Sequence, residues 1–342
     1  MKQRGVKVFL EMLLKYGVPL VISVGLCWLL FRDFDFREMW RLIATECNYW
    51  WIVAMMAVSI LSHIARAMRW QIQLRALGVN PPLFYIVLSI FGTYAVNLVF
   101  PRLGEVWRTG YIAKRQAAPF ATVFGSMVAD RLADTITVLL LLIFTFFVAS
   151  DSLDAYLSQS GALYDTVRSI IFSPIAWGLV AAAVVALWWI FTVKTSNKVI
   201  CRLQNAVKGL WEGFAVVVKM PGRLRWLAFT FLIWGCYFLQ FYLSFYSFPF
   251  TAGLLDKYGI MPALVGFVLS SIAMGVPSNG GIGPWQWAVI FALGIYGLDG
   301  ERAGAFANLV LGSTTLLVIA LGLFTFITIA LSKRNTPTNH QS

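Results

Sequence analysis

Residues 97–108 place groups that bind anions at the end of an apolar run. The stretch contains Pro101 and Gly104, and its polar side chains are Asn97, Arg102, Glu105 and Arg108. A helix is disfavoured at Phe100 because a proline follows it. A planar guanidinium fork matches the oxygens of a phosphate with two parallel hydrogen bonds. The stretch therefore predicts a turn that carries a phosphate-binding site.

The surrounding sequence predicts that this turn lies inside a membrane. The chain is 59% hydrophobic and only 12% charged, with a mean hydropathy of +0.76, whereas a soluble domain carries about 25% charged residues. Several apolar runs approach the roughly 20 residues that a spanning helix needs. They are Tyr16–Phe31, Tyr49–Ala65, Thr135–Ser150, Pro174–Val193, Trp226–Phe248 and Ala303–Leu331. We expect an all-α, polytopic integral membrane protein, in which a central arginine costs about 2.5–3.5 kcal/mol and marks function.

Two further polar stretches are candidate parts of the same site. Asp130, Arg131 and Asp134 follow at helical spacing, so that the two carboxylates face one side. They could take a proton or a cationic headgroup, or they could neutralise arginines such as Arg102 and Arg108. Glu105 could either serve the site or stabilise the start of a helix.

The third stretch is a turn rich in glycine. Its candidate site residues are Asn279, Gly280, Gly281 and Gly283. The glycine amides could bind an anion, as successive amides in turns do, or the glycines could form a close-packed elbow. We expect Asn97 and Asn279 to hydrogen-bond the interrupted backbone.

The distribution of charge predicts the topology. Lysine and arginine concentrate in 1–15, 62–80 and 194–225, whereas 32–48 and 151–173 are acidic. Basic loops face the cytoplasm, so we expect both termini there. If Leu83–Phe100 crossed the membrane, the later basic loops would lie outside the cell and the acidic loop 151–173 would lie inside, opposite to what is expected. We therefore interpret 83–118 as a re-entrant hairpin from the cytoplasmic side.

A second interrupted segment predicts an inverted repeat. Residues 262–298 form two short apolar arms around the glycine turn, and their flanks look extracytoplasmic. Each half would then have three spans and one hairpin, a pattern found in transporters with a midplane site. The predicted organisation comprises a first repeat (1–150), an extracytoplasmic connector (151–173), a second repeat (174–332) and a cytoplasmic tail (333–342).

Three motifs resemble those of a known family. They are N-x-x-x-P-x-x-G-E-x-x-R at 97–108, D-R-x-x-D at 130–134 and G-x-P-x-x-G-G-I-G-P at 275–284. In this order they are similar to the lysylphosphatidylglycerol synthase transmembrane-region family, which is also described as flippase-like. In its bacterial multiple peptide resistance factor, such a domain moves aminoacylated phosphatidylglycerol between leaflets and a separate domain makes the lipid. The resemblance implies a flippase in the bacterial cytoplasmic membrane, and we expect no synthase domain in this chain.

Other classes of protein are less well supported by the residues. The net charge of +12 is explained by the cytoplasmic loops, so no nucleic-acid partner is expected. The four cysteines and two histidines are scattered, and neither a metal site nor a cofactor is expected. Asp33 and Asp35 would suit a polytopic glycosyltransferase with a lipid-linked donor, but their loop is short. A non-transporting membrane subunit is the other alternative.

These observations predict a lipid flippase or transporter and no catalytic residues. Its substrate would be a lipid with a phosphate-containing headgroup, namely a phospholipid, an aminoacyl-phospholipid or a polyprenyl-phosphate-linked sugar. The expected partners are membrane lipids, with a separate lipid-modifying enzyme as a further candidate.

Overall fold

The computed structural model describes residues 36–100, 102–148, 220–276 and 278–334, together with Pro174 and Gly178. Two compact units are present, one comprising Met1–Met127 with Pro221–Ser342 and the other Val128–Met220. The described residues form ten α-helices and one short 3-10 helix, without a strand. The expectation of an all-α protein is therefore confirmed.

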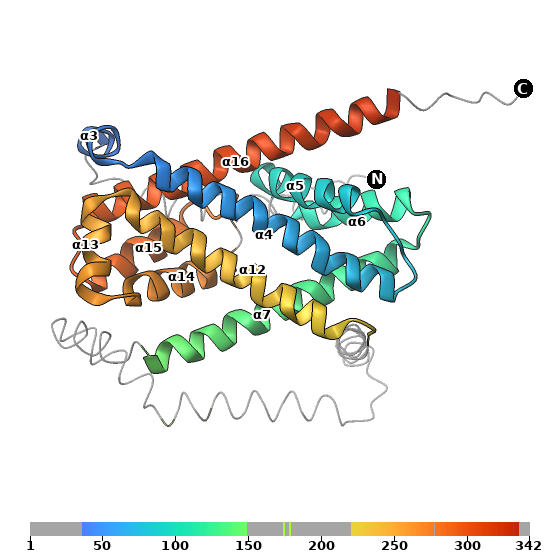
Figure 1. The fold of residues 1–342 in the computed structure, drawn as a ribbon, viewed down its shortest axis with the longest axis horizontal. Helices are drawn as coiled ribbons and strands as arrows, with labels where there is room; N and C mark the ends of the chain where they lie inside the picture. Colours follow the sequence, from blue (N-terminus) through green and yellow to red (C-terminus); the bar gives the residue numbers. More distant parts are fainter. Residues whose placement is uncertain are drawn as a thin grey trace, which may run out of the picture. The chain divides into compact units, whose positions relative to one another are not determined.

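Four of the described helices are long and apolar enough to cross a membrane. They are α4 (Tyr49–Ala76), α7 (Phe120–Val148), α12 (Arg223–Ser244, extended to Ser247 by the 3-10 helix η2) and α16 (Gly300–Arg334). At about 1.5 Å of rise per residue, each exceeds the roughly 30 Å thickness of a hydrocarbon core. The chain is therefore a polytopic membrane protein (Figure 1).

Two of these helices extend beyond the apolar runs that the sequence indicated. The apolar run Tyr49–Ala65 continues as helix to Ala76, and the run that starts at Thr135 is preceded by helix from Phe120. In α4 part of the polar continuation is buried, with Arg66 at 3% and Arg69 at 0% exposure, whereas Arg75 at its end is exposed. No proline interrupts either continuation, so the backbone stays helical through the polar residues.

The first predicted hairpin is formed by two short helices. Helix α5 covers Leu83–Val99 and α6 covers Leu103–Arg115. Helix α5 ends where Phe100 adopts an extended conformation, with φ −125° and ψ 103°, as expected for a residue before proline. At 17 and 13 residues, the arms measure about 26 and 20 Å, shorter than the hydrocarbon core.

The second half contains a matching pair of short helices. They are α14 (Met261–Ala273) and α15 (Pro284–Ile295), which pack against each other on either side of the glycine turn. Helix α13 (Pro249–Tyr258) precedes α14 and meets it at a bend of 110°. The amphipathic helix α3 (Phe36–Glu46) contacts α16.

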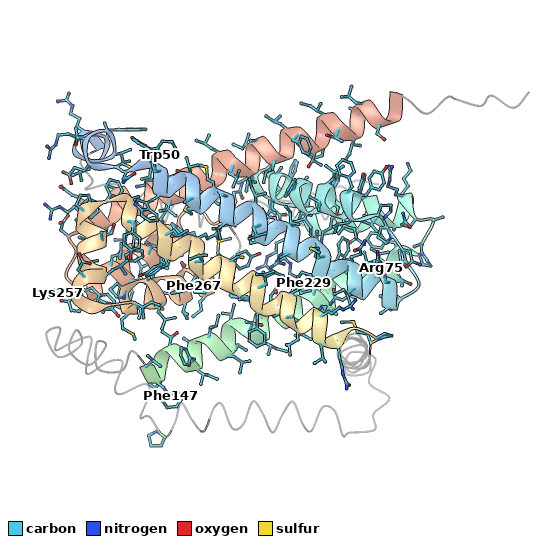
Figure 2. The ribbon with its side chains drawn as sticks, viewed as in Figure 1. Trp50, Arg75, Phe147, Phe229, Lys257 and Phe267 are labelled. Carbon is cyan, nitrogen blue, oxygen red and sulfur yellow. The ribbon has the colours of Figure 1, made fainter. Side chains whose placement is uncertain are left out.

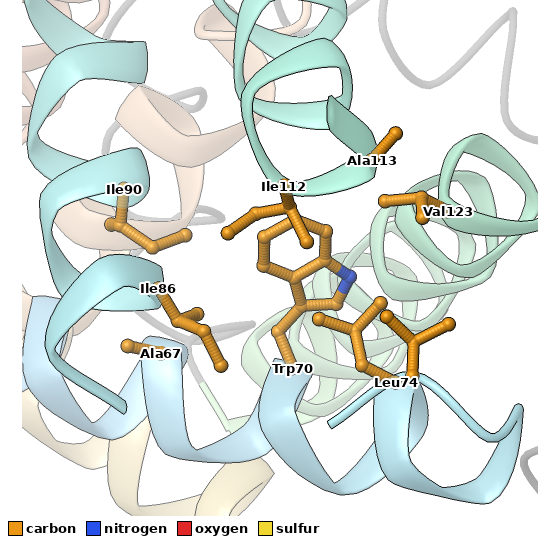
Figure 3. Packing of buried hydrophobic residues seen from close by; sticks show 9 residues of the cluster. Ala67, Trp70, Leu74, Ile86, Ile90, Ile112, Ala113 and Val123 are labelled. Carbon is orange, nitrogen blue, oxygen red and sulfur yellow. The ribbon is translucent and has the colours of Figure 1, made fainter. Parts of the chain in front are cut away.

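The first hairpin is anchored on α4 by a cluster around Trp70. The indole has no exposed surface, and the side chains of Ile86, Ile112 and Val123 surround it (Figure 3). Its Nε1 donates a hydrogen bond to Ser126 Oγ at 3.0 Å, which satisfies the ring's polar atom. Residues of α4, α5, α6 and the first turns of α7 therefore share one core.

Helix α16 lies against α5 at very short range. A methyl group added at Gly322 would come within 2.3 Å of the Ala95 Cβ. Thr325 Oγ1 also donates a hydrogen bond to the Leu88 carbonyl at 3.4 Å. Small residues allow the backbones of two membrane helices to approach closely. Gly322 and Ala95 therefore let α16 pack directly against α5.

The inverted repeat itself stays a prediction. One proposed span in each half, Tyr16–Phe31 and most of Pro174–Val193, lies outside the described residues. The 151–173 connector, Asp33 and Asp35, and residues after Arg334 also lie outside them.

The predicted topology can be tested at three exposed residues. Arg75 and Lys257 lie at opposite ends of the first unit (Figure 2), and Lys114 lies in the last turn of α6. In a cysteine-free background with single cysteines at these positions, an impermeant maleimide should label Lys257→Cys in intact cells. Arg75→Cys and Lys114→Cys should react only after permeabilisation. Labelling of Lys114→Cys in intact cells would contradict the topology.

Candidate functional site

The tip of the first hairpin lies between the end of α5 and the start of α6, and the side chain of Asn97 bridges it. Asn97 Oδ1 accepts a hydrogen bond from the Gly104 N–H at 2.8 Å, and its Nδ2 donates to Glu105 Oε2 at 3.3 Å. The first N–H groups of a helix lack partners within the helix, and Asn97 supplies one for α6. The expectation that Asn97 bonds the interrupted backbone is confirmed. Glu105 lies in the first turn of α6, where its charge suits the helix dipole.

Gly104 is needed for the two arms to meet. A Cβ at this position would lie 2.2 Å from the Thr93 carbonyl oxygen and 2.7 Å from Asn97 Oδ1. Thr93 Oγ1 in turn donates to the Ser89 carbonyl at 2.7 Å. The backbone of α6 thus rests directly on the backbone of α5, without room for a side chain.

The second tip is an elbow that only glycine forms easily. Gly280, Gly281 and Gly283 have φ values of 63°, 86° and 92°, a region that other residues avoid. The Gly283 N–H donates to Gln286 Oε1 at 3.0 Å, so this amide is already used within the elbow. Asn279 is half-buried in the turn, and its carbonyl accepts a hydrogen bond from the Ile282 N–H at 3.2 Å.

Gln286 links this elbow to α16. Its Nε2 donates to Asn308 Oδ1 on the neighbouring helix, while its Oε1 accepts from Gly283. One side chain therefore closes the start of α15 and ties it to a spanning helix. Of the two readings of the glycine turn, these contacts favour the close-packed elbow.

The two tips contact each other. Arg102 Nη2 donates a hydrogen bond to the Gly275 carbonyl at 2.7 Å. A Cβ at Gly280 would come within 2.6 Å of Leu98 Cδ2. Arg102 and Gly275 are both exposed, so the connection between the tips lies at an accessible surface. Arg102 adopts φ 64°, which is uncommon for a residue with a side chain.

Arg108 differs from the expected position. The sequence placed it with Arg102 and Glu105 in the predicted phosphate-binding turn. Its side chain is instead 1% exposed, and its guanidinium carbon lies 4.6 Å from the centre of a Trp70 ring. Six positions beyond Arg102, the helix has turned this side chain onto α4. In this conformation Arg108 is a buried cation, whereas Arg102 is accessible.

Asp130, Arg131 and Asp134 lie within α7. Asp130 is 0% exposed, Asp134 is 9% exposed, and Arg131 is half-buried. The helix places both carboxylates on one face, as their spacing predicts. These three residues belong to the unit that begins at Val128, and their part in the site stays a prediction.

Sequence reasoning missed two buried arginines on α4. It assigned Arg66 and Arg69 to a cytoplasmic loop, but both are buried beside α12. A signal was present, because Arg66, Arg69 and Gln73 recur at helical spacing with no glycine or proline before Gly78. Groups of histidine, cysteine or acidic residues that could hold a metal ion do not occur in the described part of the chain.

The tight contact of α6 on α5 predicts unequal effects of two substitutions in one helix. Gly104→Ala should lower the thermal stability of the purified protein, because the added methyl group strikes backbone of α5; overpacking costs about 1–3 kcal/mol. Gly110→Ala is the matched control, since nothing lies within 4 Å of its Cβ. It should be neutral or stabilising, because alanine favours helix by about 1 kcal/mol. Equal melting temperatures for the two variants would contradict the contact.

Comparisons with known proteins agree with the motifs. A family model described as the lysylphosphatidylglycerol synthase TM region matches residues 18–322, which include both hairpins and α7. No curated protein and no solved structure matches the chain. Since the match covers most of its length, the chain belongs to the family of the lysylphosphatidylglycerol synthase TM region.

Proposed function

We propose that the protein moves a lipid with a phosphate-containing headgroup between the leaflets of the bacterial cytoplasmic membrane. The lipid would be a phospholipid, an aminoacyl-phospholipid or a polyprenyl-phosphate-linked sugar. Membership of a family named for a lipid synthase supports a function related to membrane lipids. The movement of the lipid and the identity of the headgroup are our proposal.

The meeting of the two hairpin tips carries this proposal. Helices α5, α6, α14 and α15 have 17, 13, 13 and 12 residues, so each is shorter than a hydrocarbon core of about 30 Å. If the hairpins enter from opposite sides, their contact lies within the membrane. Irregular backbone at that depth is tolerated where it is buried in protein or lines a polar path. Interrupted helices of this kind form the substrate sites of many transporters.

Arg102 supplies the chemistry that a phosphate requires. It is exposed at the tip, and its Nη2 binds the Gly275 carbonyl. A phosphate oxygen carries a negative charge, so it is a stronger acceptor for this donor than a neutral carbonyl. Helix α6 begins at the next residue, Leu103, and the start of a helix also favours anions. In the proposed cycle, a lipid phosphate replaces Gly275 as the partner of Arg102.

Translocation in reconstituted vesicles tests the role of Arg102. With fluorescent phosphatidylglycerol, Arg102→Ala should slow transfer between leaflets about tenfold, the loss expected for one charge-assisted hydrogen bond. Arg102→Lys should fall between this variant and the wild type, because it keeps the charge but loses the planar fork. Lys114→Ala is the control, since Lys114 is also exposed but lies at the far end of α6.

Thermal stability is measured in parallel, so that a folding defect is recognised. Wild-type transport by a stable Arg102→Ala variant would remove Arg102 from the headgroup path. Wild-type protein that moves none of the three lipid classes faster than protein-free vesicles would contradict the proposed function.

A further inference from the structure

One end of the first unit carries exposed arginines from three helices. Arg75 lies in the last turn of α4, Arg115 in the last turn of α6, and Arg223 and Arg225 in the first turn of α12. All four side chains are exposed, and Figure 2 labels Arg75 at this end of the ribbon. We call these four arginines the basic rim. It lies at the end of the unit that we expect to face the cytoplasm.

The three helix ends of the basic rim meet at the end of α4. Leu74, near that end, shares a buried cluster with Ile112 and Ala113, which lie near the end of α6. Ile72 approaches the start of α12, because its Cγ2 would lie 3.5 Å from a Cβ at Gly222, the residue before that helix. The arginines of the basic rim therefore come from helix ends that pack together.

The first hairpin holds one of these arginines in a fixed orientation. The guanidinium carbon of Arg115 lies 3.3 Å from the centre of the Tyr85 ring, near the start of α5. A guanidinium stacks favourably on the face of an aromatic ring. In this arrangement its N–H donors point out at the edge, in the fork geometry that phosphate oxygens accept. Arg115 is therefore oriented for an anion while its side chain stays exposed.

The acidic residues in the described part of this unit lie away from the basic rim. Glu105 is in the first turn of α6, about 15 Å of helix rise before Arg115. Helices α3 and α13 and the start of α16 gather where α4 begins, because α3 leads into α4, α13 follows the end of α12, and α16 starts beside α13. These elements hold the other acids, which are Glu38, Glu46, Asp256, Asp299 and Glu301. The rim therefore presents positive charge that attracts anions.

Exposed apolar side chains accompany the arginines and indicate what they meet. Leu224 stands between Arg223 and Arg225 and is 77% exposed, and Phe84, which precedes Tyr85, is 52% exposed. Basic residues next to exposed apolar ones are typical of segments at the boundary between lipid headgroups and acyl chains. There the apolar side chains enter the acyl-chain region while the guanidiniums reach the headgroups. This combination fits a membrane surface better than a soluble acidic protein.

We infer that the basic rim binds the headgroups of anionic lipids in the adjoining leaflet. The four guanidiniums contact lipid phosphates, and Leu224 lies among the acyl chains of the bound lipids. Clusters of basic residues at the end of membrane helices bind anionic headgroups in this way. The rim is distinct from the hairpin tips, since Arg115 lies at the opposite end of α6 from Arg102. The inference does not depend on whether the protein moves lipid between leaflets.

Lipid titrations of the purified full-length protein in detergent test this inference. The probes are dioctanoyl phosphatidylglycerol, which is anionic, and dioctanoyl phosphatidylcholine, which is zwitterionic. Both contain a phosphodiester, so a contact with phosphate alone, as proposed for Arg102, is common to both lipids. The ratio of their dissociation constants therefore reports the preference for net negative charge. The wild type should prefer phosphatidylglycerol at least about tenfold, and this preference should largely disappear between about 0.01 and 1 M salt, because salt screens exposed charges.

Substitutions of exposed arginines identify the surface responsible. Arg75→Gln, Arg223→Gln and Arg225→Gln should each lower the preference about fivefold, the factor expected for one basic residue at an anionic surface. Arg223→Lys and Arg225→Lys keep the charge and should retain most of the preference. Lys257→Gln is the matched control, because it removes an exposed cation at the opposite end of the unit. It should leave the preference unchanged.

The outcomes separate the basic rim from the proposed function. A preference that is absent in the wild type, insensitive to salt, unchanged in all three glutamine variants or equally reduced in Lys257→Gln overturns the rim. Thermal stability is measured in parallel, and the salt series needs only the wild type if a variant fails to fold. Protein that transports no lipid, but whose preference depends on the arginines, refutes transport and retains the rim. Active transport without an arginine-dependent preference does the reverse.

Discussion

Hydrocarbon cannot form hydrogen bonds with a peptide group. This constraint applies most strongly where a helix is interrupted. A spanning helix satisfies its own backbone, but a helix that stops inside the membrane exposes N–H and C=O groups that must find partners in the protein. At the first tip Asn97 supplies one acceptor, and at the second Gln286 does so. In both interrupted segments one amide side chain accepts a hydrogen bond from a backbone N–H near the start of a helix.

The breaks in the helices were predictable because the residues that cause them act locally. Pro101 prevents helix at Phe100, and the glycines of the second turn adopt positive φ, which follows from backbone sterics alone. The pairing of the two tips followed from charge distribution and segment length. Membership of the family was visible in three motifs that lie at or near these breaks.

The burial of individual arginines was not predictable from these signals. A hydropathy reading ends an apolar run at its first charges, so it placed Arg66 and Arg69 in a loop although α4 continues to Ala76. Their environment is created by α12, more than 150 positions away in the sequence. Arg108 likewise stacks on Trp70 of another helix. Whether an arginine side chain is exposed or buried depends on contacts with helices that are distant in the sequence. The local sequence pattern does not specify these contacts.

The close packing of α5 on α16 has a consequence for the lipid transport that we propose. At Gly322 and Ala95 the two backbones leave no space for one methyl group, so a hydrocarbon tail cannot pass between them. In the proposed transport the lipid tails remain in the bilayer while the headgroup crosses, so they would slide along an opening in the protein wall. The α5–α16 contact closes one side of the first hairpin against such passage. In the transport that we propose, the opening for the tails would therefore lie on another side of that hairpin.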